Sequence, residues 1–142
     1  MPTRSSAPDC LVDTSAAVPL LLGGHPAHPA VMAALRGRRR GLSGHAAFET
    51  FSVLTRLPLP DRVSAADAAE LIARSFPATR FVGAEQAVDL LARLPSLGVS
   101  GGQVYDALVG AAAALHRVPL VTRDRRAAEV YRRLGVQVEL VV

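Results

Sequence analysis

The sequence contains no lysine, no asparagine and no tryptophan, so all 16 of its basic residues are arginine. Without lysine, the chain cannot use a phosphate-binding loop of the usual kind, form a Schiff base with a substrate or build the lysine-containing acidic pocket of a receiver domain. It also lacks a GxGxxG fingerprint, so no motif supports a nucleotide-cofactor fold. These absences exclude several common classes of enzyme and signalling domain.

The single cysteine, Cys10, lies within an apolar run, which excludes a disulfide inside the chain and predicts a buried, unreactive thiol. A chain without disulfides suits a reducing cytosol. No apolar run approaches the length of a membrane span. Residues 16–22 form a poor signal-peptide core because Asp9 and Asp13 precede them and Pro19 interrupts them. We therefore expect a cytoplasmic protein with no membrane contact.

The 142 residues suffice for one domain with a substantial core, since half of them are apolar, although only 4% are aromatic. The formal net charge of +4 favours a polyanionic partner. Charge alone determines neither the fold nor the specificity of such a partner, so this indication is a weak one.

Apolar runs and helical periodicities alternate along the chain after residue 8. We expect strands at 10–12, 41–43, 80–82, 119–122 and 136–141, and helices at 15–22, 28–35, 45–57, 64–76, 85–94, 103–116 and 125–134. This alternation predicts one three-layer α/β domain, residues 9–142, with a mostly parallel sheet. Residues 1–8 are expected to form a flexible arm. The core is expected to include the large side chains of Phe48, Phe51, Tyr105, Leu108 and Leu115. For Tyr105, which directly precedes Asp106, the alternative is that its hydroxyl is presented to a site formed by acidic residues.

Four acidic residues fall where such a sheet would gather them. Asp13 and Asp124 each follow a predicted strand, and Glu49 and Asp106 lie in early turns of apolar helices. In open α/β sheets, ligands bind beyond the carboxyl ends of the strands, and a helix that follows a strand begins at the same edge. Clustered carboxylates raise one another's pKa, so a fold that assembles them usually binds a cation between them. All-oxygen ligands select Mg²⁺ or Mn²⁺.

Taken singly, each acid also has an ordinary structural explanation. Asp106 is a favourable charge at a helix N-terminus, and Asp124 is a helix N-cap. Asp13 is a turn residue after a strand, and Glu49 is a solvated helix residue. Their coincidence at one edge of the predicted sheet is what favours a metal site over these four separate explanations.

The chain resembles the PIN-domain ribonucleases, and in particular the VapC-type toxins of bacterial toxin–antitoxin pairs. The resemblance rests on the order and spacing of four segments, VDTSA at 12–16, FET at 48–50, VYDAL at 104–108 and VTRD at 121–124. It covers nearly the whole chain except the first eight residues. It implies a five-stranded parallel sheet in the strand order 3-2-1-4-5, which would place the strands before Asp13 and Asp124 side by side.

The resemblance implies that Asp13, Glu49, Asp106 and Asp124 are the catalytic metal ligands, Asp124 being the more variable position. It implies Mg²⁺ or Mn²⁺ as cofactor, which would activate water and stabilise the leaving 3′ oxygen during cleavage of single-stranded RNA. It also implies a VapB-type antitoxin as partner and a homodimer. Two alternatives remain open: a non-catalytic RNA- or protein-binding module on a PIN scaffold, and a DNA-directed nuclease, because this chemistry needs no 2′-hydroxyl.

Hydroxyl side chains accompany the acids. Thr14, Ser15 and Thr122 match the family pattern, and we expect them to position the acids or a water molecule, with turn and strand-end hydrogen bonding as the alternative. His45 is expected near the start of the helix that carries Glu49, where it can contact substrate or serve as a cap.

Arginines occur in two groups. Arg123, Arg125 and Arg126 flank Asp124, and they are candidates for contacts with RNA phosphates, with simple surface charge as the alternative. The denser run at 36–40 precedes a strand and is therefore expected at the opposite edge of the sheet, as a solvated face or an oligomer contact.

Overall fold

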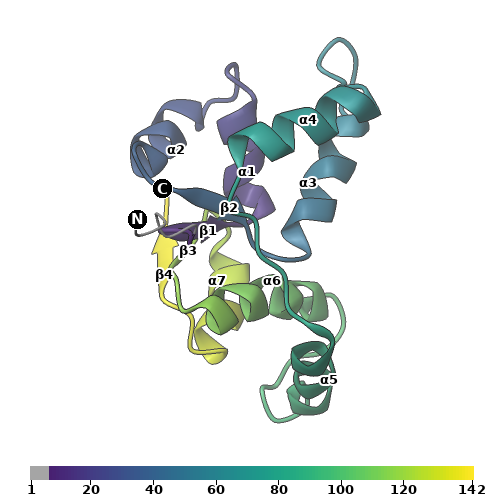
Figure 1. Ribbon diagram of the computed structural model, residues 1–142, viewed down its shortest axis with the longest axis vertical. Coiled ribbons are helices and arrows are strands. Elements are labelled where there is room, and N and C mark those ends of the chain that lie inside the picture. Colours follow the sequence, from purple (N-terminus) through teal and green to yellow (C-terminus); the bar gives the residue numbers. More distant parts are fainter. Residues whose placement is uncertain (1–6) are drawn as a thin grey trace, which may run out of the picture.

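The structure, a computed structural model, describes residues 7–142, so the flexible arm expected at 1–8 lies mostly outside the described residues and stays a prediction. Short parallel strands form the central sheet in the order β2-β1-β3-β4 (Figure 1). They are β1 (Cys10–Val12), β2 (Arg40–Leu42), β3 (Leu120–Thr122) and β4 (Val138–Leu140). The helices of the described residues are α1 (Thr14–Leu21), α2 (His28–Leu35), α3 (Ala46–Thr55), α4 (Ala65–Ser75), α5 (Ala84–Arg93), α6 (Gln103–His116) and α7 (Arg125–Arg133).

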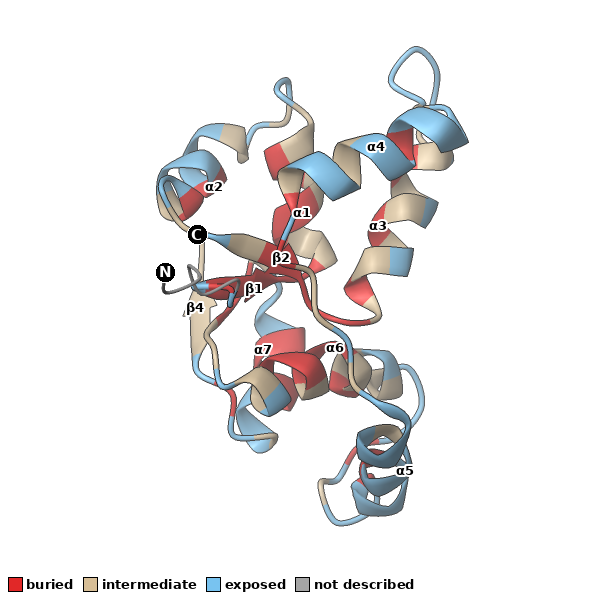
Figure 2. Ribbon diagram, in the orientation of Figure 1, coloured by how far each residue is buried: buried red, intermediate tan, exposed pale blue. Residues whose placement is uncertain are grey.

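Helices cover both faces of the sheet, with α1 to α4 on one side and α5 to α7 on the other (Figure 1). The side chains of β1 explain this arrangement, because successive side chains of a strand point to opposite faces of the sheet. Cys10 and Val12 pack with α1 and α2, whereas Leu11 packs with α6 and α7. All three side chains are fully buried (Figure 2), and burial raises the pKa of the Cys10 thiol. The predicted α/β domain with a parallel sheet and a buried thiol is confirmed.

The prediction of five strands is wrong, because residues 80–82 form no regular strand. Arg80 makes only an isolated parallel bridge with Ser43, beside β2. The Arg80 amide donates to the carbonyl of Leu42 at 3.2 Å. The Leu42 amide, however, donates to the Thr79 hydroxyl at 3.0 Å instead of to a backbone carbonyl. A side chain thus takes one place in the parallel ladder and interrupts it.

Gly41 allows this segment to approach β2 closely. A Cβ added at Gly41 would lie 2.1 Å from the backbone carbonyl group of Ala78, a distance that no real side chain tolerates. The segment before Arg80 therefore takes the position expected for the third strand while pairing at a single bridge. At the other edge, β4 is shorter than predicted because the Val136 amide donates to the carbonyl of Tyr131 at the end of α7.

The expected core is wrong for three large side chains. Phe48 is 65% exposed, Tyr105 is 56% exposed and Leu115 is 42% exposed. Small residues take buried positions of α6 instead: Ala112 packs in the cluster of Leu11 in the sheet, and Ala107 packs in the cluster of Leu90 in α5. Tyr105 and Leu115 lie on the exposed surface of the same helix. None of the described helices is both long and apolar enough to span a membrane.

Candidate metal centre

Asp13 is the most buried of the four predicted acids, with only 4% of its surface exposed. It ends β1 and caps α1, and its two carboxylate oxygens are hydrogen-bonded. Oδ1 accepts from the Ser15 hydroxyl at 2.6 Å and from the Ala16 amide at 3.3 Å. Oδ2 accepts from the Thr122 hydroxyl and from the Tyr131 hydroxyl, the latter at 2.8 Å. Burial raises the pKa of Asp13, and these four hydrogen bonds oppose that rise.

The same hydroxyls join the ends of β1 and β3, which pair in parallel. The Ser15 and Thr122 hydroxyl oxygens lie 3.2 Å apart. Ser15 Oγ accepts from the amide of Arg123 at 2.8 Å, and Thr122 Oγ1 accepts from the amide of Asp124 at 3.0 Å. Both hydroxyls therefore fix the Asp13 carboxylate relative to the turn that begins α7.

Glu49 lies in the first turn of α3 and faces α1. Its Oε2 accepts from the Thr14 hydroxyl at 3.2 Å. Its Oε1 lies 3.4 Å from Nε2 of His45, the residue that precedes the helix. All three hydroxyl residues predicted to surround the acids thus contact one, Thr14 at Glu49 and the other two at Asp13.

Asp106 lies in the first turn of α6, and Asp124 is the N-cap of α7. Asp124 Oδ1 accepts from the first free amides of that helix, Arg126 at 2.9 Å and Ala127 at 3.1 Å. Partial burial, and then the charges of Asp124, Glu49 and Asp13, raise the pKa of Asp106 to about 6. The fold therefore gathers the four predicted acids closely enough for each of the other three to disfavour ionisation of Asp106.

This donor set suits a hard divalent cation. All four acids offer oxygen, and the carboxylate of Asp106 accepts no hydrogen bond from the described residues. Within residues 7–142, no group of three or more His, Cys, Asp or Glu side chains lies close enough together to hold a metal ion in this arrangement. The residues fit such an ion by charge and ligand chemistry, and binding requires the carboxylates to draw together around it.

Tyr131 was missed by the sequence-based prediction, although it contacts the most buried acid. Its ring is 2% exposed, and both burial and the charge of Asp13 raise the pKa of its hydroxyl, which therefore stays protonated and donates. Gly110 of α6 makes room for it, because a Cβ at that position would lie 3.0 Å from the Tyr131 ring. The available signal was the spacing of Tyr131, two helical turns after Asp124 on the same face of α7.

The two groups of arginines differ in their contacts. In the run at 36–40, Arg38 forms a bidentate pair with Glu139, with nitrogen–oxygen distances of 2.7 and 2.9 Å. This run leads into β2, whose first residue is Arg40, and so lies at the amino ends of the strands, as predicted. The expectation of a solvated face is wrong for Arg38, which bonds within the chain. Beside the acids, Arg125 and Arg126 are exposed, and Arg123 is half-buried with its Nε unpartnered among the described residues.

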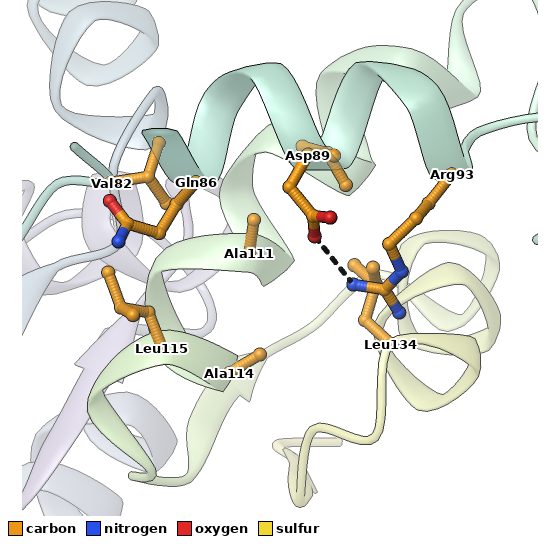
Figure 3. A pocket seen from close by; sticks show the side chains of 9 residues that line it. Val82, Gln86, Asp89, Arg93, Ala111, Ala114, Leu115 and Leu134 are labelled. Carbon is orange, nitrogen blue, oxygen red and sulfur yellow. Dashed lines mark ion pairs between the residues drawn. The ribbon is translucent and has the colours of Figure 1, made fainter. Parts of the chain in front are cut away.

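Two hollows flank α6. One, of about 240 Å³, lies between α5 and α6 and contains the ion pair of Asp89 and Arg93 at 3.7 Å (Figure 3). None of the four acids lines it. The other is an open groove of about 590 Å³ that includes Glu49, Thr14 and Tyr105 among its lining residues. The groove, and not the hollow in Figure 3, therefore adjoins the candidate metal centre.

The four acids and strands β1 to β3 lie within a segment that matches a known protein family. The family model described as "PIN domain" matches residues 10–133, and the chain belongs to this family. It is 47% identical over 131 residues to "Ribonuclease VapC27" of Mycobacterium tuberculosis, an alignment covering 92% of this chain and 96% of that protein. It is 42% identical over 133 residues to "Ribonuclease VapC40" of the same species, covering 91% and 96%. Within the PIN-domain family, the chain is of the VapC type.

Proposed function

We propose that this protein is a Mg²⁺- or Mn²⁺-dependent endoribonuclease that cleaves single-stranded RNA and acts as the toxin of a type II toxin–antitoxin pair. The observation that carries the proposal is the placement of Asp13, Glu49, Asp106 and Asp124 beyond the carboxyl ends of the parallel strands and in the first turns of helices. Partial burial and then the charges of the three other acids raise the pKa of Asp106, in agreement with this placement. A charge cluster of this kind opposes folding, so a function must account for it. The names of the two similar proteins, both ribonucleases, supply the reaction class.

The bound cation would supply a nucleophilic hydroxide and stabilise the charge that develops on the leaving 3′ oxygen. Asp13, Glu49, Asp106 and Asp124 would hold it, and their roles differ. Asp13 is rigid because its carboxylate accepts four hydrogen bonds. Asp106 accepts none from the described residues, so its carboxylate can turn toward a ligand without breaking a bond. One fixed acid and one adjustable acid can position a cation and adapt to the phosphate.

The experiment is a cleavage assay of the purified protein on a labelled single-stranded RNA and on the single-stranded DNA of the same sequence. We expect cleavage of RNA in Mg²⁺ or Mn²⁺, products with 5′-phosphate and 3′-hydroxyl ends, and no cleavage in EDTA. Cleavage at full rate in EDTA would contradict the metal mechanism. RNA binding without cleavage in any divalent metal would favour a non-catalytic module, and preferential cutting of DNA would favour a DNA-directed nuclease.

We further propose a VapB-type antitoxin as partner, with its C-terminal segment covering the acids, and a homodimer of the toxin. Co-purification with the product of a neighbouring gene for a small DNA-binding protein, followed by restored cleavage once that product is removed, tests the antitoxin. Light scattering of the isolated chain tests the dimer, for which twice the monomer mass is the expected result.

A further inference from the structure

Beside the acids, α3 and α6 carry aromatic rings that the solvent reaches. Tyr105 directly precedes Asp106 and is 56% exposed. The His45 ring lies stacked on it, with the ring centroids 5.4 Å apart and the planes inclined by 26°. The Tyr105 ring is thus stacked on His45 and still largely exposed, so a further flat group can stack on it.

The groove of about 590 Å³ has both rings among its lining residues. Its floor includes Thr14 and Glu49, which contact each other through the Thr14 hydroxyl at 3.2 Å. Arg56, at the C-terminus of α3, also lines it. The Arg56 side chain is exposed and forms no ion pair with any residue of the described part of the chain. One groove therefore presents a candidate metal ligand, a stacking surface and an available positive charge.

We propose that this groove binds the nucleotide that adjoins the scissile phosphate, with its base stacked on Tyr105 beside His45 and its outer phosphate paired with Arg56. The inference rests on the proposed ribonuclease function, and it adds where one nucleotide of the RNA lies and which side chains hold it. Base–aromatic stacking is tolerant of sequence, because every base has a π-face. Tyr105 and Arg56 are then binding residues that position the chain across the acids.

The lining favours a nucleic acid over a protein segment or a second copy of this chain. Apolar character alone does not distinguish a protein interface from other surfaces, so the kinds of group that lie together decide between these occupants. The groove places the aromatic rings beside Arg56, with Ser52 and Glu49 also in its lining. A planar base beside an anion needs a ring and a cation at neighbouring positions, which the groove supplies. The groove also continues into the candidate metal centre through Glu49, so a chain lying in it would pass over the acids.

The chain is well suited to a direct test because it contains two tyrosines and no tryptophan. Tyr131 is buried against Asp13, so any quenching of tyrosine fluorescence by an added base should come from Tyr105. The experiment uses Asp13→Asn as an uncleaving background in Mg²⁺ and titrates a ten-nucleotide single-stranded RNA. We expect tyrosine emission to fall on binding. Tyr131→Phe should leave this quenching in place, and Tyr105→Phe should remove it while preserving affinity.

Binding strengths then locate the stacked base. Tyr105→Ala should weaken binding about tenfold, the loss expected for one base–aromatic stack. A set of RNAs, each lacking one base at a different position, then identifies the stacked base. Removal of that base should weaken binding to the background protein and should leave binding to Tyr105→Ala as strong as that of the intact RNA. Arg56→Ala should lower the slope of log affinity against log salt by about one phosphate contact. Phe81→Ala, an exposed ring outside the groove, is the matched control and should bind RNA normally.

Unchanged RNA affinity of Tyr105→Ala, together with normal cleavage by the wild-type chain, would overturn the nucleotide site and leave the proposed function standing. If Tyr105→Ala had unchanged RNA affinity but a lower molecular mass than the wild type in light scattering, the groove would be an interface between copies of this chain and the nucleotide site would be overturned. A wild-type chain that neither binds nor cuts RNA would instead contradict the proposed function itself.

Discussion

Arg38 and Glu139 form a bidentate ion pair, whereas Asp106 lies among three other carboxylates. The first arrangement lowers the pKa of Glu139, chiefly through the hydrogen bonds from Arg38. In the second, partial burial and then the charges of the three other acids raise the pKa of Asp106 to about 6. Opposite charges that pair help the chain to fold, and like charges that gather oppose it. The acidic cluster lacks the stabilising effect of the ion pair, and this favours a functional explanation for it.

Hydrogen bonding makes a second contrast within the cluster itself. Asp13 accepts from three hydroxyls and an amide, while Asp106 accepts no hydrogen bond from the described residues. Burial is the largest cause of the raised pKa at both acids, but only at Asp13 do hydrogen bonds oppose it. The fold thus compensates the buried acid locally and leaves Asp106 without such hydrogen bonds.

The largest expected effect is on catalysis. Asp106→Asn removes one ligand charge and nearly preserves side-chain volume, so RNA cleavage in Mg²⁺ should fall by a factor of about 100 or more, while the fold survives. Single-turnover cleavage rates measure this loss, and circular dichroism checks the fold. Arg38→Leu, which breaks the distant ion pair, is the matched control and should cleave RNA at the wild-type rate. Wild-type activity in Asp106→Asn would show that the active site lies elsewhere.

The second effect is on RNA binding. Arg125→Ala with Arg126→Ala removes two exposed charges beside Asp124, and affinity for single-stranded RNA should fall about tenfold with a flatter salt dependence. Arg36→Ala with Arg39→Ala removes as much charge at the amino ends of the strands and should change binding less. Fluorescence anisotropy at several salt concentrations makes the comparison. A larger loss from the second pair would reverse our assignment of the RNA-binding side.

The positions of the acids were predictable because topology fixes them. Asp13 and Asp124 follow neighbouring parallel strands. Their place beyond the carboxyl ends follows from the strand pattern, whereas the adjacency of the two strands was implied by the resemblance to the PIN-domain family. The hydroxyl contacts of Ser15 and Thr122 follow from the same local geometry. Strand ends and helix starts are set by nearby sequence, so residues placed there can be located without knowing how distant helices pack.

Features that depend on distant packing were not predictable. The hydrogen bond from Tyr131 to Asp13 needs α7 to approach α6 at Gly110, which is a property of two helices and not of either alone. Tyr105 was expected in the core because it is aromatic, but small residues such as Ala107 occupy the inward face of α6. The third strand was lost because the Thr79 hydroxyl replaces a backbone acceptor.

The third effect concerns the stabilising pair. Arg38→Leu leaves the partly exposed Glu139 without its bidentate partner. Solvent screens the pair, so the free energy of unfolding should fall by only about 1.5 kcal/mol at pH 7. Because the pKa of Glu139 is lowered on folding, this contribution is present above its ordinary value of 4.5 and is lost as the pH falls through the folded value. Urea unfolding at pH 7 and pH 3 measures both, and Arg36→Ala should match the wild type. Equal losses at the two pH values would contradict an ionic contribution.

The smallest effect has the opposite sign and completes the comparison. The pKa of Asp106 rises from 3.8 to about 6 on folding, so the native state binds more protons across that range. Stability of the metal-free protein should therefore fall as the pH rises from about 4 to about 6 and then level off. Since Asp106 is partly exposed, solvent screening reduces the penalty, and Asp106→Asn should raise the free energy of unfolding in EDTA by about 1 kcal/mol at pH 7.

Thermal or urea unfolding of Asp106→Asn and the wild type, in EDTA and in Mg²⁺, measures this penalty. Mg²⁺ should stabilise the wild type more than the variant, because the ion neutralises a repulsion that the variant has already lost. Asp89→Asn, an exposed acid outside the cluster, is the control and should show neither the gain in EDTA nor the reduced response to Mg²⁺. If Asp106→Asn were less stable than the wild type in EDTA at pH 7, the four acids would not repel one another in the folded chain. Asp106 would then stabilise the fold, as Glu139 does, and the acidic cluster and the ion pair would have the same sign of effect on the free energy of unfolding.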